Sequence, residues 1–149
     1  MQEALDEARR AASEGEVPVG AVVVWRGEIL GRGHNQREGR HDPTAHAEIL
    51  ALRQAGATRG GWRLAGCTLY CNLEPCAMCA GAMVNARIER LVFAVRDPKT
   101  GAAGSVFDIV RAPWLNHQLK VVSGVLADEA AALMQSFFQE RRPRTEGTH

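Results

Sequence analysis

Two short segments constrain this chain more than any other feature, because their side chains are of the kinds that hold a metal ion. In the first segment His46 stands shortly before Glu48, and in the second Pro75 precedes Cys76 and Cys79. A structural zinc site normally closes with four protein ligands, whereas a catalytic site uses three and keeps the fourth position open. The segments offer one histidine and two cysteines, so the chain has to fold in a way that brings them together.

The two cysteines are spaced for one face of a helix. Cys76 and Cys79 stand at positions i and i+3, Pro75 comes before them, and the Ala-rich residues 80–84 follow. A helix begins with free backbone N–H groups and the positive end of its dipole, and both favour the thiolate form of cysteine, which binds metal. We therefore expect a helix that starts near Cys76 and presents two thiolates.

His46 begins a second predicted helix. This helix covers residues 47–55, follows the helix-breaking residues 42–44 and ends at Gly56. Side chains at i and i+2 of a regular helix point about 200° apart, but the leading residue of the first turn can leave helical geometry. The side chains of His46 and Glu48 can then approach one point from different directions. We predict that His46 binds the metal and that Glu48 does not.

Three metal ligands beside a free carboxylate are suited to hydrolysis. Water can be activated at the open position, and Glu48 can accept a proton and return it. The reaction that fits best is hydrolytic deamination of a nucleobase ring, for which His-x-Glu followed by Pro-Cys-x-x-Cys is a known signature. Each motif alone has other interpretations, since Cys-x-x-Cys can be a redox pair or half of a structural zinc site, and His-Ala-Glu is usually a capped helix start. Their occurrence together and in this order favours a catalytic site.

The length and composition favour one domain in a reducing compartment. We expect residues 1–149 to form a single domain, with a disordered tail at residues 145–149. There is no apolar run of about 18 residues and the N-terminus is acidic, so neither a membrane span nor a secretory signal is expected. The four cysteines suit a cytoplasmic protein. Cys67 and Cys71 share one face of a predicted strand, and we interpret them as small buried residues without a functional role.

The charge distribution limits how the chain could contact nucleic acid. A net charge of +1 does not favour a nonspecific polyanion binder, so any contact has to be local. Residues 87–99 and 141–144 are the two basic segments, although such segments are usually solvated surface. Phe137 and Phe138 lie just before the second segment on a predicted helix. Periodicity alone favours the core for both rings, and the alternative is that one ring faces the core and the other faces solvent.

Hydrophobic periodicity divides the chain into helices and strands. The pattern predicts a first helix that ends near Gly15, a hairpin of strands 19–25 and 28–31, a loop over 35–44, the helix after His46, a strand over 67–71, the helix at Cys76, a strand over 91–95, a loop over 96–105, a strand over 119–122 and a last helix from about Asp128 to Arg142. Alternating strands and helices favour parallel pairing in an α/β sandwich. In such a fold strand ends and helix starts face one crevice, where the metal-type residues can meet.

These residues resemble the cytidine deaminase-like superfamily and, within it, the bacterial tRNA-specific adenosine deaminases. The resemblance covers nearly the whole chain. Its marks are residues 16–21, 39–48 and 73–82, and the more specific segments 96–105, 116–117 and 124–129. The resemblance implies a three-layer α/β/α sandwich with a five-stranded mixed sheet.

The resemblance also implies an activity. The expected reaction is hydrolytic, zinc-dependent deamination of adenosine to inosine at the wobble position of an arginine tRNA. A homodimer would act on the tRNA anticodon stem-loop without another protein. Each subunit would hold one Zn²⁺ through His46, Cys76 and Cys79, with Glu48 as the proton shuttle.

A set of substrate contacts follows from the same resemblance. An amide suits contact with a base edge because it both donates and accepts hydrogen bonds, although Asn35 would otherwise be interpreted as a turn residue. Aromatic rings and cations suit single-stranded RNA loops. The implied contacts are Asn35 to the base, Val17, Pro18, Ala47 and Pro75 around the base pocket, and Asp97, Lys99, Phe138, Arg141 and Arg142 to the anticodon loop.

Two other functions remain open at this point. A deaminase of free bases or nucleosides, such as guanine or cytosine, needs the same metal site but neither the basic tail nor the loop over residues 96–105. A noncatalytic, zinc-stabilised RNA-binding subunit would not require Glu48. Riboflavin-pathway deaminases fit less well, because their cysteines are spaced more widely than Cys76 and Cys79.

Overall fold

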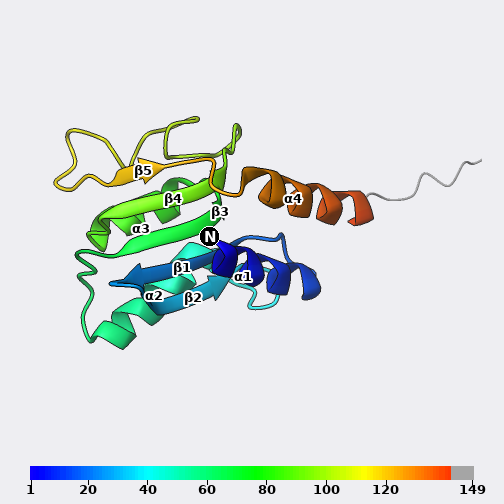
Figure 1. The fold of residues 1–149 in the computed structure, drawn as a ribbon, viewed down its shortest axis with the longest axis horizontal. Helices are drawn as coiled ribbons and strands as arrows, with labels where there is room; N and C mark the ends of the chain where they lie inside the picture. Colours follow the sequence, from blue (N-terminus) through cyan, green and yellow to red (C-terminus); the bar gives the residue numbers. More distant parts are fainter. Residues whose placement is uncertain (142–149) are drawn as a thin grey trace, which may run out of the picture.

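The protein is built around one sheet that is covered by helices on both faces (Figure 1). Residues 1–141 are described by a computed structural model. In chain order the elements are α1 (Gln2–Ser13), β1 (Gly20–Trp25), β2 (Glu28–His34), α2 (Ala47–Arg59), β3 (Thr68–Leu73), α3 (Ala77–Asn85), β4 (Arg90–Val95), β5 (Lys120–Val122) and α4 (Ala127–Arg141).

The sheet is mixed and has five strands, as expected. Its order is β2-β1-β3-β4-β5. Strand β1 runs antiparallel to both of its neighbours, whereas β3, β4 and β5 are parallel to one another. The predicted hairpin is present, and its turn residues Arg26 and Gly27 have φ angles of 49° and 79°, which is the left-handed geometry of a tight two-residue turn.

Small residues set the distance between the sheet and its helices. A side-chain carbon added at Gly31 of β2 would overlap the Ala51 carbonyl of α2. One added at Gly33 would overlap the Ala47 carbonyl, so α2 can lie directly on this strand. Gly20 of β1 points to the opposite face and makes the same room for α1. Since α3 joins α2 on one face and α4 joins α1 on the other, the three-layer α/β/α prediction is confirmed.

Helices α2 and α3 begin at the metal-type residues. His46 caps α2 with extended backbone (φ −75°, ψ 150°), and Cys76 caps α3 in the same way (φ −74°, ψ 175°). His46 therefore leaves helical geometry, as predicted. The predicted end of α2 at Gly56 is wrong, because the helix continues to Arg59 and ends at Gly60, whose φ is 81°. A glycine inside a helix costs about 1 kcal/mol, which the packing of α2 on β2 offsets.

The buried residues agree with several other predictions. Cys67 and Cys71 are buried free cysteines in the core between the sheet and α2 and α3. On α4, Phe137 is 7% exposed and Phe138 is 49% exposed, which confirms the alternative that one ring faces the core and the other faces solvent. No helix within residues 1–141 is both long and apolar enough to cross a membrane. The predicted helix end at Arg142 and the predicted tail lie outside the described residues.

Candidate active site

The starts of α2 and α3 bring three metal-type side chains to one point. Nδ1 of His46 lies 3.6 Å from Sγ of Cys76 and 3.6 Å from Sγ of Cys79, and the three donor atoms all lie within 4.8 Å of one another. In a tetrahedral zinc site with Zn–N of about 2.05 Å and Zn–S of about 2.3 Å, nitrogen and sulfur ligands are about 3.6 Å apart. The spacing therefore fits zinc. Within residues 1–141 the cluster has no fourth protein ligand.

The surroundings of Cys76 favour the thiolate form of its side chain. The hydrogen bond from the Cys79 thiol outweighs the effect of burial and, together with the contact to His46, lowers the pKa of Cys76 to about 4. The start of α3 contributes unpaired N–H groups and a partial positive charge at the same place. Because the thiolate is the form that binds metal, the local structure favours the ligand role of Cys76.

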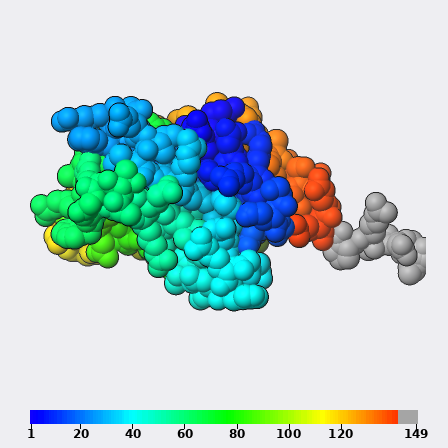
Figure 2. All heavy atoms as spheres, turned by 90° about the horizontal axis from the view of Figure 1, so that it is seen from below, coloured from blue at the N-terminus to red at the C-terminus, as the bar shows by residue number. Residues whose placement is uncertain are grey.

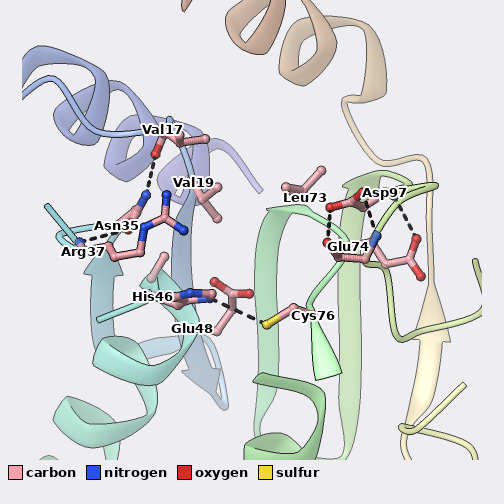
Figure 3. Close-up of a pocket in the computed structure, with 12 residues that line it drawn as sticks. Val17, Val19, Asn35, Arg37, His46, Glu48, Leu73, Glu74, Cys76 and Asp97 are labelled. Atoms are coloured by element: carbon pink, nitrogen blue, oxygen red, sulfur yellow. Dashed lines mark hydrogen bonds between the residues drawn. The ribbon is translucent and has the colours of Figure 1, made fainter. Parts of the chain in front are cut away.

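Glu48 lies next to this cluster in the first turn of α2 (Figure 3). The residue is 4% exposed, and within residues 1–141 its Oε1 atom is buried without a hydrogen-bond partner. Burial raises the pKa of this carboxyl, and the negative charge of Cys76 raises it further. A buried polar atom without a partner costs stability, so its presence beside metal-type residues is typical of a group kept for chemistry.

His46, Glu48 and Cys76 line a cavity of about 170 Å³ between two walls (Figure 3). One wall comes from the segments that flank β1 and β2, and the other comes from the end of β3 and the loop after β4. The lining residues are Val17, Val19, Asn35, Arg37, His46, Ala47, Glu48, Leu73, Glu74, Cys76, Asp97 and Thr100. The cavity therefore collects half of the residues that the sequence predicts for the site, namely Val17, Asn35, His46, Ala47, Glu48, Cys76 and Asp97.

The side-chain amide of Asn35 keeps hydrogen-bonding groups that a ligand could use. Its Nδ2 donates to the Val17 carbonyl at 3.2 Å, and its Oδ1 accepts from the Arg37 backbone N–H at 3.1 Å. A side-chain amide has two N–H donors and an oxygen with two lone pairs. One donor and one acceptor of Asn35 therefore remain, so the side chain can both fix the turn and face a ligand.

Glu74, a second buried carboxylate, belongs to the opposite wall. Its oxygens accept from the backbone N–H groups of Asp97, Ala103 and Ser105 and from the Ser105 hydroxyl. Burial acts to raise the pKa of Glu74, but these hydrogen bonds hold it below its ordinary value. A side-chain carbon at Gly101 would overlap the Glu74 carboxyl, so the loop closes tightly around it. Glu74 thus fixes the loop after β4.

The other residues predicted to contact substrate are not part of the cavity lining. Pro18 and Pro75 are buried beside it, and their carbonyls accept hydrogen bonds from the Asn72 side chain and the Ala102 backbone. Outside the cavity lining, the exposed residues of this set are Lys99, Phe138 and Arg141. The guanidinium of Arg141 stacks on the Phe137 ring at 4.3 Å. Arg142 lies outside the described residues.

Among the charged residues that line the cavity, Arg37 and Glu74 are not singled out by the sequence. Glu74 does carry a signal, because a carboxylate at the end of a buried strand and directly before Pro75 needs hydrogen-bond partners. Arg37 carries none, because it is one of several charged residues in a polar loop.

Fold and site together define a deaminase with the cytidine deaminase-like fold, and the family model of MafB19-like deaminases matches residues 1–142. A tRNA-specific adenosine deaminase of Bacillus subtilis (strain 168) is 48% identical over 144 residues, which cover 97% of this chain and 89% of the relative. The chain belongs to the family of tRNA-specific adenosine deaminases.

Solved structures agree with this assignment. A structure from work on A-to-I editing by tRNA deaminases at the wobble position of transfer RNA aligns with a TM-score of 0.86 and 44% identity, and covers 89% of this chain and 96% of that chain. A guanine deaminase from Nitrosomonas europaea aligns with a TM-score of 0.76 and 29% identity, and covers 91% of this chain and 81% of that chain. The fold is therefore common to deaminases of different substrates, and the identity is higher toward the tRNA branch.

Proposed function

We propose that this protein converts adenosine to inosine by zinc-dependent hydrolysis at the wobble position of arginine tRNA. The observation that carries the proposal is that the donor atoms of His46, Cys76 and Cys79 meet beside the buried Glu48, whose Oε1 has no hydrogen-bond partner within residues 1–141. His46, Glu48 and Cys76 line one cavity. The substrate is proposed from the relatives, since the similar protein of Bacillus subtilis is a tRNA-specific adenosine deaminase.

The proposed chemistry uses one zinc ion per subunit, held by His46, Cys76 and Cys79. Bound zinc supplies a Lewis acid that lowers the pKa of water. Glu48 takes a proton from the attacking water and delivers it to the departing amino group. At C6 of adenine a C–O bond forms, the C–N bond breaks, and ammonia leaves. Because Oε1 of Glu48 has no hydrogen-bond partner within residues 1–141, this oxygen is available to receive the proton.

Base recognition is assigned to Asn35, whose spare donor and acceptor match the mixed hydrogen-bonding edge of a purine. Val17 and Ala47 line the cavity, and Pro18 and Pro75 are buried next to the lining residues Val17 and Cys76 in the sequence. The exposed ring of Phe138 offers a stacking surface for an RNA base. The further contacts that we propose with the anticodon loop are Asp97, Lys99, Arg141 and Arg142.

We also propose that the protein acts as a homodimer. The outer face of α2 and α3 carries a shallow groove, and an exposed apolar patch of this kind is typical of a protein contact surface. Trp62 at its edge is 64% exposed. The apolar residues of the groove are Ile49, Leu52, Ala57, Trp62, Leu64, Ala82 and Ala86.

The reaction is proposed to take place in the cytoplasm and without another protein. Four free cysteines suit a reducing compartment. The three proposed ligands and Glu48 come from one chain, so no second protein is needed to complete the zinc site.

A substrate comparison tests the proposal. Zinc-loaded protein is incubated with an arginine tRNA anticodon stem-loop, with the same stem-loop carrying guanosine at the wobble position, and with free adenosine, guanine and cytidine. We expect inosine at the wobble position only. Turnover of a free base but not of the RNA would assign the protein to a base-deaminating function. Turnover of none of them would favour a noncatalytic binding subunit.

A further inference from the structure

Arg37 contributes a permanently charged cationic side chain to the cavity wall. Among the described residues that line the cavity, Glu48, Glu74 and Asp97 are acidic, and Arg37 is the only arginine or lysine. An RNA strand that delivers a base into this cavity has to bring its phosphates close to these carboxylates. Arg37 is therefore placed where a phosphate needs a positive charge.

The Arg37 guanidinium is not used within the protein. Within residues 1–141 it makes no ion pair and no hydrogen bond, whereas two neighbouring arginines are engaged. Arg32 pairs with Glu3 at 2.8 Å, and Arg40 donates to the Gln36 side chain at 3.0 Å. The guanidinium of Arg37 is directed toward the gap between the two cavity walls (Figure 3).

The backbone that carries Arg37 is held in place. Its N–H donates to Oδ1 of Asn35 at 3.1 Å. The buried carboxylate of Glu16 accepts from the next two backbone N–H groups, those of Glu38 and Gly39, at 3.0 and 2.7 Å. This loop, cyan in Figure 2, projects from the body of the molecule beside α1. A fixed loop therefore presents a free guanidinium at the cavity.

We propose that Arg37 binds a phosphodiester group adjacent to the target nucleoside of the RNA substrate, an inference that rests on the proposed function. A guanidinium can donate two parallel N–H bonds to phosphate oxygens. Asn35 would bind the base, and its Oδ1 accepts a hydrogen bond from the backbone N–H of Arg37, which would bind the phosphate. The site would thus recognise a nucleotide within a strand rather than a free base.

The first test compares Arg37→Gln with Arg40→Gln, which removes the same charge from the same loop. The dissociation constant of the wobble stem-loop is measured for both variants and the wild type across a salt series. We expect Arg37→Gln to weaken binding about ten-fold and to reduce the slope of log K against log salt by about 0.7 to 1. Arg40→Gln should change both quantities much less. Equal effects of the two variants would overturn the proposal.

The second test removes the charge from the RNA. Two stem-loops are compared. Each carries a single neutral methylphosphonate in place of a phosphate, on the 5′ side of the target nucleoside in one and on the 3′ side in the other. One of the two modified stem-loops should bind the wild type about ten-fold more weakly than the unmodified stem-loop does. The same modification should leave the affinity for Arg37→Gln unchanged. Equal losses with both proteins would overturn the phosphate contact. Inosine formation is followed in the same samples, and its absence with wild-type protein would instead overturn the proposed function.

Discussion

Glu48 and Glu74 are two buried carboxylates on the same cavity, and their surroundings are opposite. Glu48 is 4% exposed, one of its oxygens has no partner within residues 1–141, and burial raises its pKa. Glu74 is 2% exposed, but its oxygens accept hydrogen bonds from Asp97, Ala103 and Ser105, and its pKa is lowered. The exposed fractions are similar, but Glu48 lies deeper in the protein, so deeper burial and the lack of hydrogen bonds together account for the difference in pKa.

The comparison separates two uses of a buried charge. A carboxylate whose lone pairs are filled by hydrogen bonds stabilises the structure that surrounds it. A carboxylate with an unfilled oxygen costs stability and is free to accept a proton. We infer that Glu48 is kept for proton transfer and that Glu74 shapes the wall on which the substrate lies.

Cys76→Ala should have the largest effect, because it removes a proposed zinc ligand. Without zinc there is no activated water from which Glu48 could take a proton. We expect a zinc-to-protein ratio well below one and no detectable deamination. Zinc is measured by atomic emission on the purified protein. Cys71→Ala is the matched control, since Cys71 is a buried free cysteine outside the cluster. Loss of zinc from both variants alike would contradict the proposed ligand set.

Glu48→Ala should separate chemistry from structure. We expect deamination to fall by at least 10²- to 10⁴-fold, while the zinc content and the affinity for the stem-loop stay at the wild-type level. The midpoint of thermal unfolding should stay the same or rise, because the substitution removes a buried atom without a partner. Single-turnover rates and thermal unfolding are measured on the same preparation. Activity within ten-fold of the wild type would rule out the shuttle role.

Glu74→Gln should show the opposite pattern. The backbone N–H groups of Asp97, Ala103 and Ser105 donate to the Glu74 carboxylate, and the amide nitrogen of glutamine cannot accept hydrogen bonds from them. We therefore expect a loss of about 1–3 kcal/mol in the free energy of unfolding. Activity should fall less than in Glu48→Ala, mainly through a higher KM for RNA. Urea unfolding and steady-state kinetics provide the two measurements. Glu28→Gln, at an exposed position in the hairpin, is the control.

The stabilising effect of Glu74 should also depend on pH. A carboxyl with a lowered folded-state pKa contributes stability that is fully present above its ordinary value of 4.5 and is lost as the pH falls through the lower folded value. The difference in unfolding free energy between the wild type and Glu74→Gln should therefore narrow below that pH. A constant difference from neutral to acidic pH would show that the charge of Glu74 is not what stabilises the loop.

Ser105→Ala should have the smallest effect. It removes one hydroxyl donor from Glu74 and leaves the three backbone donors in place. We expect a loss of about 1 kcal/mol in unfolding free energy and near wild-type activity and zinc content. A loss as large as that of Glu74→Gln would mean that the hydroxyl, rather than the backbone, holds the carboxylate.

Local sequence signals predict the parts of this protein that depend on neighbouring residues. The caps at His46 and Cys76, the Arg26-Gly27 turn and the alternation of strands and helices all follow from such signals. The end of α2 does not, because packing of α2 on β2 carries the helix through Gly56 to Arg59. Tertiary contact there overrides the local preference for a helix end.

The parts that were not predicted depend on distant residues. The partners of Glu74 lie in the loop after β4, far along the chain, so no spacing rule connects them. Arg37 and Arg40 lie in the same loop, and only the fold determines that Arg37 lines the cavity while Arg40 bonds to Gln36. Local patterns identify the proposed zinc ligands, while the substrate-facing wall emerges from the tertiary structure.

The most direct test of the central claim follows the oxygen that enters the product. Zinc-loaded wild type and Glu48→Ala are each given the wobble stem-loop in water enriched in the heavy oxygen isotope, and the nucleosides are analysed by mass spectrometry after one turnover. The account predicts inosine that carries the heavy oxygen at C6 with the wild type, and unchanged adenosine with Glu48→Ala. Unlabelled inosine, or labelled inosine formed equally fast by both proteins, would contradict hydrolysis with Glu48 as the proton carrier.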